Sequence, residues 1–202
     1  MNVREGFVIK FIATLFLVTG IGLIGFFYVS YESATGGVFA IDDSNERSTA
    51  LRELDWERIE TGDEIASLKI PVLEKAYMTY WGTEDDALDR GVGMHDSPWT
   101  TTPDEMGHTL LSGHRDTVFR ELGDLEQGDE MILEYDGVRY SYIIEDIWIT
   151  SAEDQSVVVE KDSATLTLST CYPFHLLGAA PDRYIIQAKL IDETRITLTK
   201  YK

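Results

Sequence analysis

The sequence predicts a mostly β domain, either a closed barrel or a sandwich with short helices, that follows an N-terminal transmembrane helix. Two observations support this fold class. An uncharged apolar run stands near the start of the 202-residue chain, and short runs rich in Ile, Val, Thr and Tyr recur between turn signals after residue 61. Many short strands with few helices are typical of barrels and sandwiches rather than of alternating parallel sheets. Residues 61–202 are therefore expected to form one β domain.

The apolar run spans residues 11–29 (FIATLFLVTGIGLIGFFYV) and contains no charged residue. At about 1.5 Å per residue, a helix of this length covers roughly 30 Å, enough to cross the hydrocarbon of a bilayer. Arg4 and Lys10 precede the run and no basic residue follows it until Arg47, so residues 1–10 are expected to be cytoplasmic and the rest extracellular. A cleaved signal peptide is the alternative, but no clear small-x-small cleavage site follows the run. The sequence favours an uncleaved single-pass anchor in the cell membrane.

Residues 30–60 combine Gly, Ser and Thr with many charges and lack a sustained apolar run. The second half, residues 44–60 (SNERSTALRELDWERIE), has a weak helical period in which Leu51, Leu54 and Trp56 are the apolar positions. We expect an acidic extracellular stalk, helical in part, that holds the β domain away from the membrane.

Several runs within residues 61–202 have strand character. They are ASLKIPV (66–72), EMILEYDGVRYSYII (130–144), ATLTLSTC (164–171), RYIIQAKL (183–190) and ITLTKY (196–201). Asp136-Gly137 divides the second run and is a strong signal for a two-residue β-hairpin turn. Shorter stretches have helical character: TEDDALDRG (83–91), TVFRELGDL (117–125) and SAEDQSVV (151–158).

The composition argues against several functions. The chain has 17 basic and 36 acidic side chains, a formal charge of −19, and such a surface repels phosphate backbones, so no nucleic-acid partner is expected. The single cysteine, Cys171, excludes an intramolecular disulfide, and no Cys/His pair has the spacing of a zinc site. The acidic clusters at residues 84–89 (EDDALD) and 124–130 (DLEQGDE) lack EF-hand spacing, so calcium is possible but not supported and no cofactor is expected.

Cys171 is either a packing residue at the end of a strand or a nucleophile. A nucleophilic cysteine needs a proton partner and a group that stabilises the oxyanion formed in acyl transfer. Of the four histidines, His114 directly follows an apolar strand end in LLSGHRDTVF, where its side chain can be held rigidly, so it is the first candidate. His108 is the second, ahead of His95 and His175.

The oxyanion-stabilising group has two candidates. Arg183 begins the run RYIIQAKL, which should be a strand next to ATLTLSTC, so Arg183 and Cys171 should lie at the same edge of the sheet. Arg115 adjoins His114 in sequence, and on an extended segment its side chain would point the opposite way from that histidine. The alternative for Arg183 is a salt bridge with Asp182 or another carboxylate.

Three motifs in combination resemble the sortase family: TLSTC (167–171), SGHRDT before it (112–117) and PDRY after it (181–184). The resemblance runs from about residue 65 to residue 190 and includes the segments IPV, RGVGMH and LGDLEQGDEM. Sortases are membrane-anchored cysteine transpeptidases of Gram-positive bacteria, and the fold that the resemblance implies is a closed eight-stranded β-barrel. The combination of SGHRDTVFREL, TCYPF and APDRYII is most similar to class D sortases.

The resemblance also implies the role of each site residue. Cys171 is the expected nucleophile, His114 the general acid and base, and Arg183 the group that binds the oxyanion and the substrate. Thr170 matches the family's threonine before the cysteine and is expected to support the site by hydrogen bonding. We also expect only a minority of molecules to hold the thiolate–imidazolium pair near neutral pH.

The implied reaction is cleavage of an LPxT-type C-terminal sorting signal after its threonine, through a thioester acyl-enzyme, and transfer to an amine of a cell-wall precursor. The expected partners are secreted proteins that carry such signals, the peptidoglycan precursor amine, and the lipid bilayer through the N-terminal helix. Two alternatives stay open. One is a membrane-tethered extracellular cysteine peptidase that hydrolyses rather than transfers, and the other is a non-catalytic module in which Cys171 is only packed.

The chain departs from the family pattern at two places. His108 stands where many relatives have a small polar residue such as Asn, and Pro98-Trp99 replaces the more usual Leu-Pro-Gly in the loop SPWTTTPDEM. We expect both departures to change the packing at the rim of the site.

Overall fold

The structure is a computed structural model that describes residues 3–41, 54–175 and 178–196, in two compact units, Met1–Ala34 and Thr35–Lys202. Helix α1 (Val3–Thr35) accounts for the first unit. Its stretch Lys10–Val29 is apolar and long enough to cross a membrane, none of it is buried, and a signal sequence has the same character. A helix therefore forms where the sequence predicted a membrane span.

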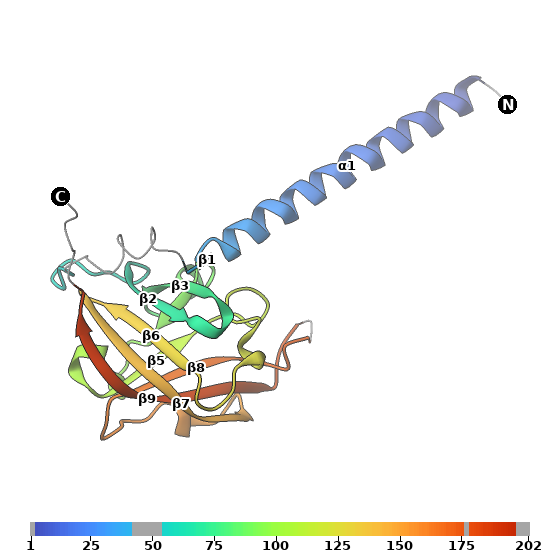
Figure 1. The fold of residues 1–202 in the computed structure, drawn as a ribbon. Helices are drawn as coiled ribbons and strands as arrows, with labels where there is room; N and C mark the ends of the chain where they lie inside the picture. Colours follow the sequence, from blue (N-terminus) through green and yellow to red (C-terminus); the bar gives the residue numbers. More distant parts are fainter. Residues whose placement is uncertain (1–2, 42–53, 176–177, 197–202) are drawn as a thin grey trace. The chain divides into compact units, whose positions relative to one another are not determined.

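The second unit is a β domain with short helical turns (Figure 1). Its strands are β1 (Val38–Ala40), β2 (Glu64–Ile70), β3 (Lys75–Trp81), β4 (Val92–Met94), β5 (His108–Ser112), β6 (Glu130–Tyr135), β7 (Val138–Ser151), β8 (Thr165–Tyr172) and β9 (Asp182–Arg195). Its helical segments are α3 (Asp85–Leu88) and the 3-10 turns Pro71–Leu73, Pro103–Glu105, Leu122–Asp124 and Gln155–Val157.

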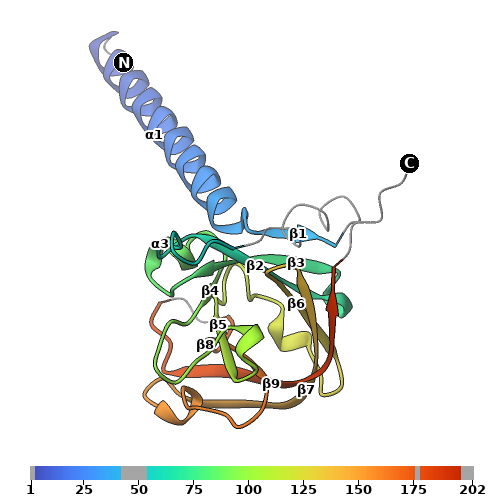
Figure 2. The ribbon, with the colours of Figure 1, turned by 90° about the vertical axis from the view of Figure 1, so that its left-hand side faces the viewer.

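Eight of these strands close into a barrel (Figure 2). Neighbouring strands follow the order β3-β2-β6-β7-β9-β8-β5-β4, and the pairing of β4 with β3 completes the ring. Strand β3 shares one edge between two partners, because Lys75–Tyr77 pair with β1 and Thr79–Trp81 pair with β4. Two pairings are parallel, β3 with β4 and β5 with β8, and the others are antiparallel.

The alternation of side chains along each strand separates the barrel interior from its outer face. On β8, Leu166 and Leu168 belong to the main core. Their partners on the neighbouring strand β9, Ala188 and Ile186, belong to the same core. The hairpin between β6 and β7 turns at Asp136 and Gly137, both with positive φ (46° and 74°), as a type I′ turn requires. The predicted closed barrel and the predicted Asp136-Gly137 turn are both confirmed.

Some elements differ from the sequence prediction. The helix expected over residues 117–125 is limited to the 3-10 turn Leu122–Asp124. The strand β3 was not among the predicted strands, although its residues KAYMTYW include three aromatic side chains that favour strands. In the segment expected to be a stalk, β1 pairs with β3 and residues 54–60 form turns rather than helix. Residues 42–53, which carry the rest of the expected stalk helix, and most of the predicted strand 196–201 lie outside the described residues.

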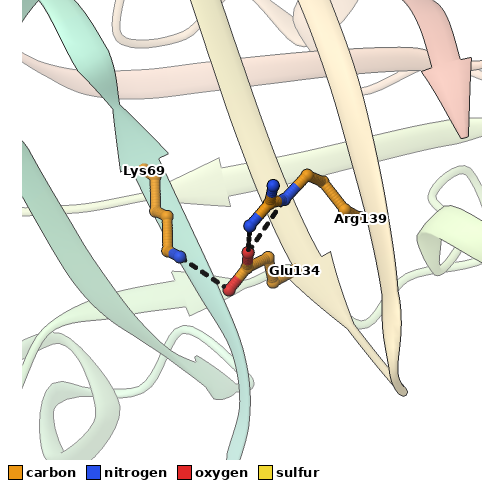
Figure 3. A network of polar contacts seen from close by, with 3 residues as sticks. All are labelled: Lys69, Glu134 and Arg139. Atoms are coloured by element: carbon orange, nitrogen blue, oxygen red, sulfur yellow. Dashed lines mark hydrogen bonds and ion pairs between the residues drawn. The ribbon is translucent and has the colours of Figure 1, made fainter. Parts of the chain in front are cut away.

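The outer face of β2, β6 and β7 carries a buried ion network (Figure 3). Lys69 Nζ lies 2.9 Å from Glu134 Oε2, and Arg139 donates to Glu134 Oε1 through Nη2 at 2.7 Å and Nε at 3.0 Å. The Glu134 side chain is 1% exposed and that of Lys69 6%. The two cations offset the cost of burying the Glu134 carboxylate, so the network links β2, β6 and β7 on the outer face of the barrel.

Candidate active site

Cys171 and Arg183 are direct partners across the antiparallel pair β8–β9. Directly opposite residues in such a pair point to the same face with their Cβ atoms about 4.5–5.5 Å apart. Cys171 is a free, half-buried thiol near the end of β8, and Arg183 stands at the start of β9. The structure therefore brings these two predicted site residues together at one edge of the barrel, as their spacing suggested.

The Arg183 guanidinium is held by the backbone that precedes it. Its Nη1 donates to the carbonyl of Asp182 at 3.1 Å and to that of Ala180 at 3.5 Å. In the described part of the chain no carboxylate forms an ion pair with Arg183, so the alternative of a salt bridge with Asp182 is not found. The guanidinium keeps further N–H groups for a substrate oxygen.

His114 is the third predicted residue, and the pairing of β5 with β8 fixes its backbone. The two strands are parallel, with Ser112 opposite Ser169, and continuing each by two residues reaches His114 and Cys171. Gly113 N donates to Ser169 O at 3.3 Å, and the buried Thr170 donates its Oγ1 to Gly113 O at 2.7 Å. Thr170 directly precedes Cys171, and Gly113 directly precedes His114, so this hydrogen bond links the two chain segments that carry the predicted nucleophile and the predicted acid and base.

The turn after β5 requires the glycine of the SGH motif. A Cβ added at Gly113 would lie 2.7 Å from Val118 Cγ2 and 2.8 Å from Phe119 Cδ2. The chain folds back over Gly113 because Phe119 N donates to His114 O at 2.9 Å, and Phe119 is fully buried in the core. This tight packing sets the position of the His114 backbone from the interior side.

Asp89 is a neighbour of His114 that the sequence prediction did not include. Its Oδ1 lies 3.7 Å from His114 Nε2, and the two side chains are 74% and 42% exposed. Asp89 follows the short helix α3, far from His114 in sequence. Only the barrel's closure brings it there, and a contact this exposed contributes little free energy.

A cavity of about 210 Å³ opens beside this edge, on the outer face of β5, β8 and β9. Ser112, Ser169 and Arg183 form part of its floor, while His95 and residues of the β7–β8 loop line its walls. Ser169 lies two residues before Cys171, roughly 7 Å along an extended strand. The cavity therefore provides a binding surface that leads up to the thiol.

His95 lines this cavity, and both His95 and His108 form their hydrogen bonds with groups other than the thiol. His108 bonds through Nδ1 to Val159 O at 2.6 Å and through Nε2 to Thr167 Oγ1 at 2.8 Å, and His95 Nε2 bonds to Ser112 Oγ at 2.8 Å. Burial lowers the pKa of both imidazoles, which favours their neutral forms.

His108 is also too distant to exchange a proton with Cys171. It pairs with Thr165 at the other end of β8, six residues and so roughly 20 Å from the cysteine. His175 is exposed in the β8–β9 connection. Among the four histidines, the strand register thus favours His114, the same choice that its sequence context suggested.

Arg115 occupies a separate, buried position. Its side chain is 8% exposed, its Nη2 donates to Gly178 O, and its Nη1 has no hydrogen-bond partner in the described region. It does not line the cavity beside Arg183. Arg115 thus connects the turn after β5 to the β8–β9 loop, and Arg183 remains the better candidate for the oxyanion.

Within residues 3–41, 54–175 and 178–196, no group of three or more His, Cys, Asp or Glu side chains is arranged to hold a metal ion. The acidic clusters at 84–89 and 124–130 are largely exposed, and Asp86 within the first of them forms an ion pair with Arg90 at 3.4 Å. The prediction that the protein works without a cofactor remains a prediction.

The fold and the motifs have matches among known proteins. Residues 68–191, more than half of the chain, match the family model of the sortase domain. Sortase D of Bacillus subtilis (strain 168) is 40% identical over 133 residues, 65% of this chain and 66% of that protein, so the match spans just under two-thirds of that relative's length.

Solved structures give the same result. The catalytic domain of B. anthracis SrtD has 51% sequence identity and a TM-score of 0.60, and the match covers 68% of this chain and 93% of that one. A Clostridium perfringens Sortase D5 transpeptidase has 28% identity and a TM-score of 0.60, covering 82% of this chain and 98% of that one. The chain belongs to the sortase family of cysteine transpeptidases and is most like the family's class D members.

Proposed function

We propose that this protein is a membrane-anchored sortase that cleaves LPxT-type C-terminal sorting signals after the threonine and transfers the protein to an amine of a cell-wall precursor. One observation carries the proposal: Cys171 and Arg183 are cross-strand partners, and Thr170 ties the residue before His114 to the same edge. In this proposal the nucleophile, the proton carrier and the cation lie at one edge of the barrel, beside a cavity that serves as the substrate's binding surface.

Acylation begins when the thiolate of Cys171 attacks the carbonyl carbon of the signal's threonine. The carbonyl oxygen becomes an oxyanion, which Arg183 stabilises, and such a preorganised donor contributes about 3–4 kcal/mol to the transition state. Collapse of this intermediate breaks the threonine's C–N bond and forms the thioester. His114 gives its proton to the departing amine, so the tail leaves as a neutral amine.

Deacylation reverses these roles. The acceptor amine attacks the thioester carbonyl, neutral His114 takes a proton from its nitrogen, and the second oxyanion again lies beside Arg183. The C–S bond then breaks, which releases the Cys171 thiolate and leaves a new amide bond. The thioester conserves the acyl group for transfer, so the sequence of steps needs no cofactor.

The resting charge state of the pair is part of the proposal. Cys171 lies near the end of a strand and not at the start of a helix, so we expect only a minority of molecules to hold the thiolate–imidazolium pair near neutral pH. Alkylation of the thiol measured across pH tests this expectation. A fully developed thiolate at pH 6 would contradict it.

Helix α1 supports the proposed location. Its apolar stretch Lys10–Val29 is long enough to span a bilayer, and Arg4 and Lys10 stand at its N-terminal side. The positive-inside rule places the N-terminus in the cytoplasm and the β domain on the extracellular side, where secreted proteins and cell-wall precursors are found. Protease accessibility of the β domain in intact cells and in inverted vesicles measures this orientation.

A peptide assay tests the reaction. The full chain in a non-ionic detergent is given LPxTG and LPxTA peptides, with and without an amine acceptor, and the products are identified by mass. A transpeptidase gives an amide product that depends on the amine, whereas the alternative, a tethered peptidase, gives the free carboxylate at the same rate with or without amine. Unchanged cleavage by a Cys171→Ala variant would overturn both readings, because each requires Cys171 as the nucleophile. No cleavage by the unaltered chain would favour a non-catalytic module.

A further inference from the structure

Trp99 is one of the two places where the sequence departs from the family pattern, and it lies in an exposed, well-braced turn between β4 and β5. The Trp99 side chain is 54% exposed, although a tryptophan usually buries its ring. Ser97 Oγ accepts from Trp99 N at 3.3 Å and bonds to Thr100 Oγ1 at 2.9 Å, and Thr100 donates to His95 O at 3.1 Å. The turn is thus organised to present the indole outward.

Trp99 lines a groove of about 1030 Å³, much larger than the cavity beside Arg183. The other lining residues all belong to the β7–β8 loop and include Glu153, Gln155 and Glu160. We call this space the upstream groove. No part of the catalytic steps described above uses it.

The upstream groove adjoins the cavity at the active site, because Ala152, Asp154 and Val158 of the β7–β8 loop line both spaces. Leaving-group chemistry places the C-terminal side of the scissile bond at His114, which does not line the cavity. The N-terminal side of the signal therefore occupies the cavity beside Arg183, and the residues before its leucine lie about four extended residues, roughly 13 Å, from the scissile bond, on the side of the cavity that adjoins the groove.

The charges of the groove favour a cationic occupant. Asp154 already accepts hydrogen bonds on both oxygens, from Thr150 Oγ1 and from Ser156 N. Glu153 and Glu160 are exposed, and neither has an ion-pair partner in the described part of the chain. The nearest cation in sequence, Lys161, donates its ammonium to Gln187 Oε1 on β9 at 3.1 Å.

We propose that the upstream groove binds basic side chains that precede the leucine of the sorting signal, with Glu153 and Glu160 as the anionic partners and Trp99 as a cation–π surface. The inference rests on the proposed function and adds a selection among its substrates. A lysine or arginine side chain meets two carboxylates at one side of the groove and the face of an indole at the other. The selectivity should appear mainly in KM, because these contacts lie far from the reacting atoms.

The test compares three sorting peptides that are identical from the leucine onward. The two residues before that leucine are Lys-Lys, Gln-Gln or Glu-Glu, and kcat/KM is measured for the full chain in non-ionic detergent at about 0.1 M salt. We expect Lys-Lys to exceed Glu-Glu by about five- to tenfold, the effect of one or two exposed charge contacts and a cation–π contact.

A matched pair of variants separates the groove from the overall charge of −19, which attracts any cation. Glu153→Gln/Glu160→Gln should reduce the Lys-Lys to Glu-Glu ratio to below about twofold and leave the Gln-Gln peptide unchanged. Glu57→Gln/Glu60→Gln removes the same charge from an exposed segment outside the groove and should preserve the ratio. Trp99→Leu keeps an apolar surface and should reduce the ratio about twofold.

The outcomes distinguish the two levels of the argument. Cleavage of the Gln-Gln peptide without any preference between the charged peptides overturns the groove proposal and leaves the sortase reaction intact. Equal ratios in the two double variants also overturn it, because the preference then arises from the net charge. No cleavage of any of the three peptides overturns the proposed function and this inference with it.

Discussion

Two regions on the outer face of the barrel differ in whether their charged side chains are paired with charges of opposite sign. On β2, β6 and β7, Glu134 is enclosed by Lys69 and Arg139 (Figure 3). On β5, β8 and β9, Ser112, Ser169 and Arg183 instead line an open cavity, and Arg183 is the cross-strand partner of Cys171. In the first region the buried Glu134 carboxylate is paired with two cations, and in the second the Arg183 guanidinium bonds, within the described residues, to carbonyl oxygens and to no carboxylate.

This difference indicates that the first region contributes to the stability of the fold, whereas the second region keeps a cation available for binding a substrate. A charge that is already paired within the protein is not available to stabilise charge on a substrate. The carbonyls of Asp182 and Ala180 orient the Arg183 guanidinium but do not neutralise its positive charge. Substitutions in the first region should therefore change the free energy of unfolding. Substitutions in the second should change rates and leave unfolding nearly unaffected.

The largest expected effect is that of Cys171→Ala. Loss of the nucleophile should reduce the cleavage rate by at least about 10⁴-fold, because no other group can form the thioester. The free energy of unfolding should change by less than about 1 kcal/mol, since the thiol is only half-buried at a strand end. Peptide cleavage and urea unfolding measure the two quantities, and a strongly destabilised variant would assign Cys171 to packing.

Arg183→Lys tests whether geometry matters beyond charge. Lysine keeps the positive charge but lacks the planar set of donors, so kcat should fall by about 10²- to 10³-fold. Arg183→Gln serves as the neutral control and should lose at least as much. Equal activity of Arg183→Lys and the wild type would show that a point charge is sufficient and would remove the guanidinium from the oxyanion site.

Glu134→Gln addresses the enclosed network. Replacing a carboxylate that contacts two cations at 1% exposure should lower the free energy of unfolding by about 3 kcal/mol. Glu145→Gln is the matched control, because Glu145 pairs with Lys189 at the surface, where such pairs contribute about 0–1 kcal/mol. Both variants should retain kcat at temperatures at which they stay folded. A small effect of Glu134→Gln on unfolding would contradict the comparison between the two regions.

Thr170→Val tests the link between the two strand ends. Valine keeps the shape but removes the hydroxyl that donates to Gly113 O, so the backbone before His114 loses one buried partner. We expect kcat to fall by about tenfold with little change in KM, and Thr170→Ser to restore most of it. A loss of stability without a change in kcat would limit Thr170 to a structural role.

The smallest effect concerns His95 and His108. Burial, the largest cause, lowers the pKa of each below the ordinary 6.5, so the unfolded chain binds more protons than the folded chain at mildly acidic pH. Their contribution to stability is complete above about pH 6.5 and is lost as the pH falls from there toward the folded pKa. Lowering the pH from 7 to 5.5 should therefore lower the free energy of unfolding, and both histidines should contribute to this loss.

Urea unfolding at the two pH values measures this loss. His108→Asn should reduce the pH dependence, since one buried imidazole is removed. An unchanged pH dependence in this variant would show that other groups are responsible.

Much of the site was predictable because its signals are local. The apolar alternation at Leu166 and Leu168 placed Cys171 at a strand end, and the position of His114 just after a short strand was evident from its flanking residues. The contact of Asp89 with His114 and the position of the β7–β8 loop along the cavity were not predicted. Strand pairings between distant parts of the chain bring both of them to the site.

The sequence by itself determined the strand periods, the apolar helix at residues 11–29, and the turn at Asp136-Gly137, because each depends on a few neighbouring side chains and their backbone preferences. Only the tertiary structure decided that β4 closes the barrel on β3, that Cys171 lies opposite Arg183, and that Trp99 lines one groove together with Glu153 and Glu160. Such pairings depend on the register between strands far apart in the chain, and that register is set by the packing of the whole core.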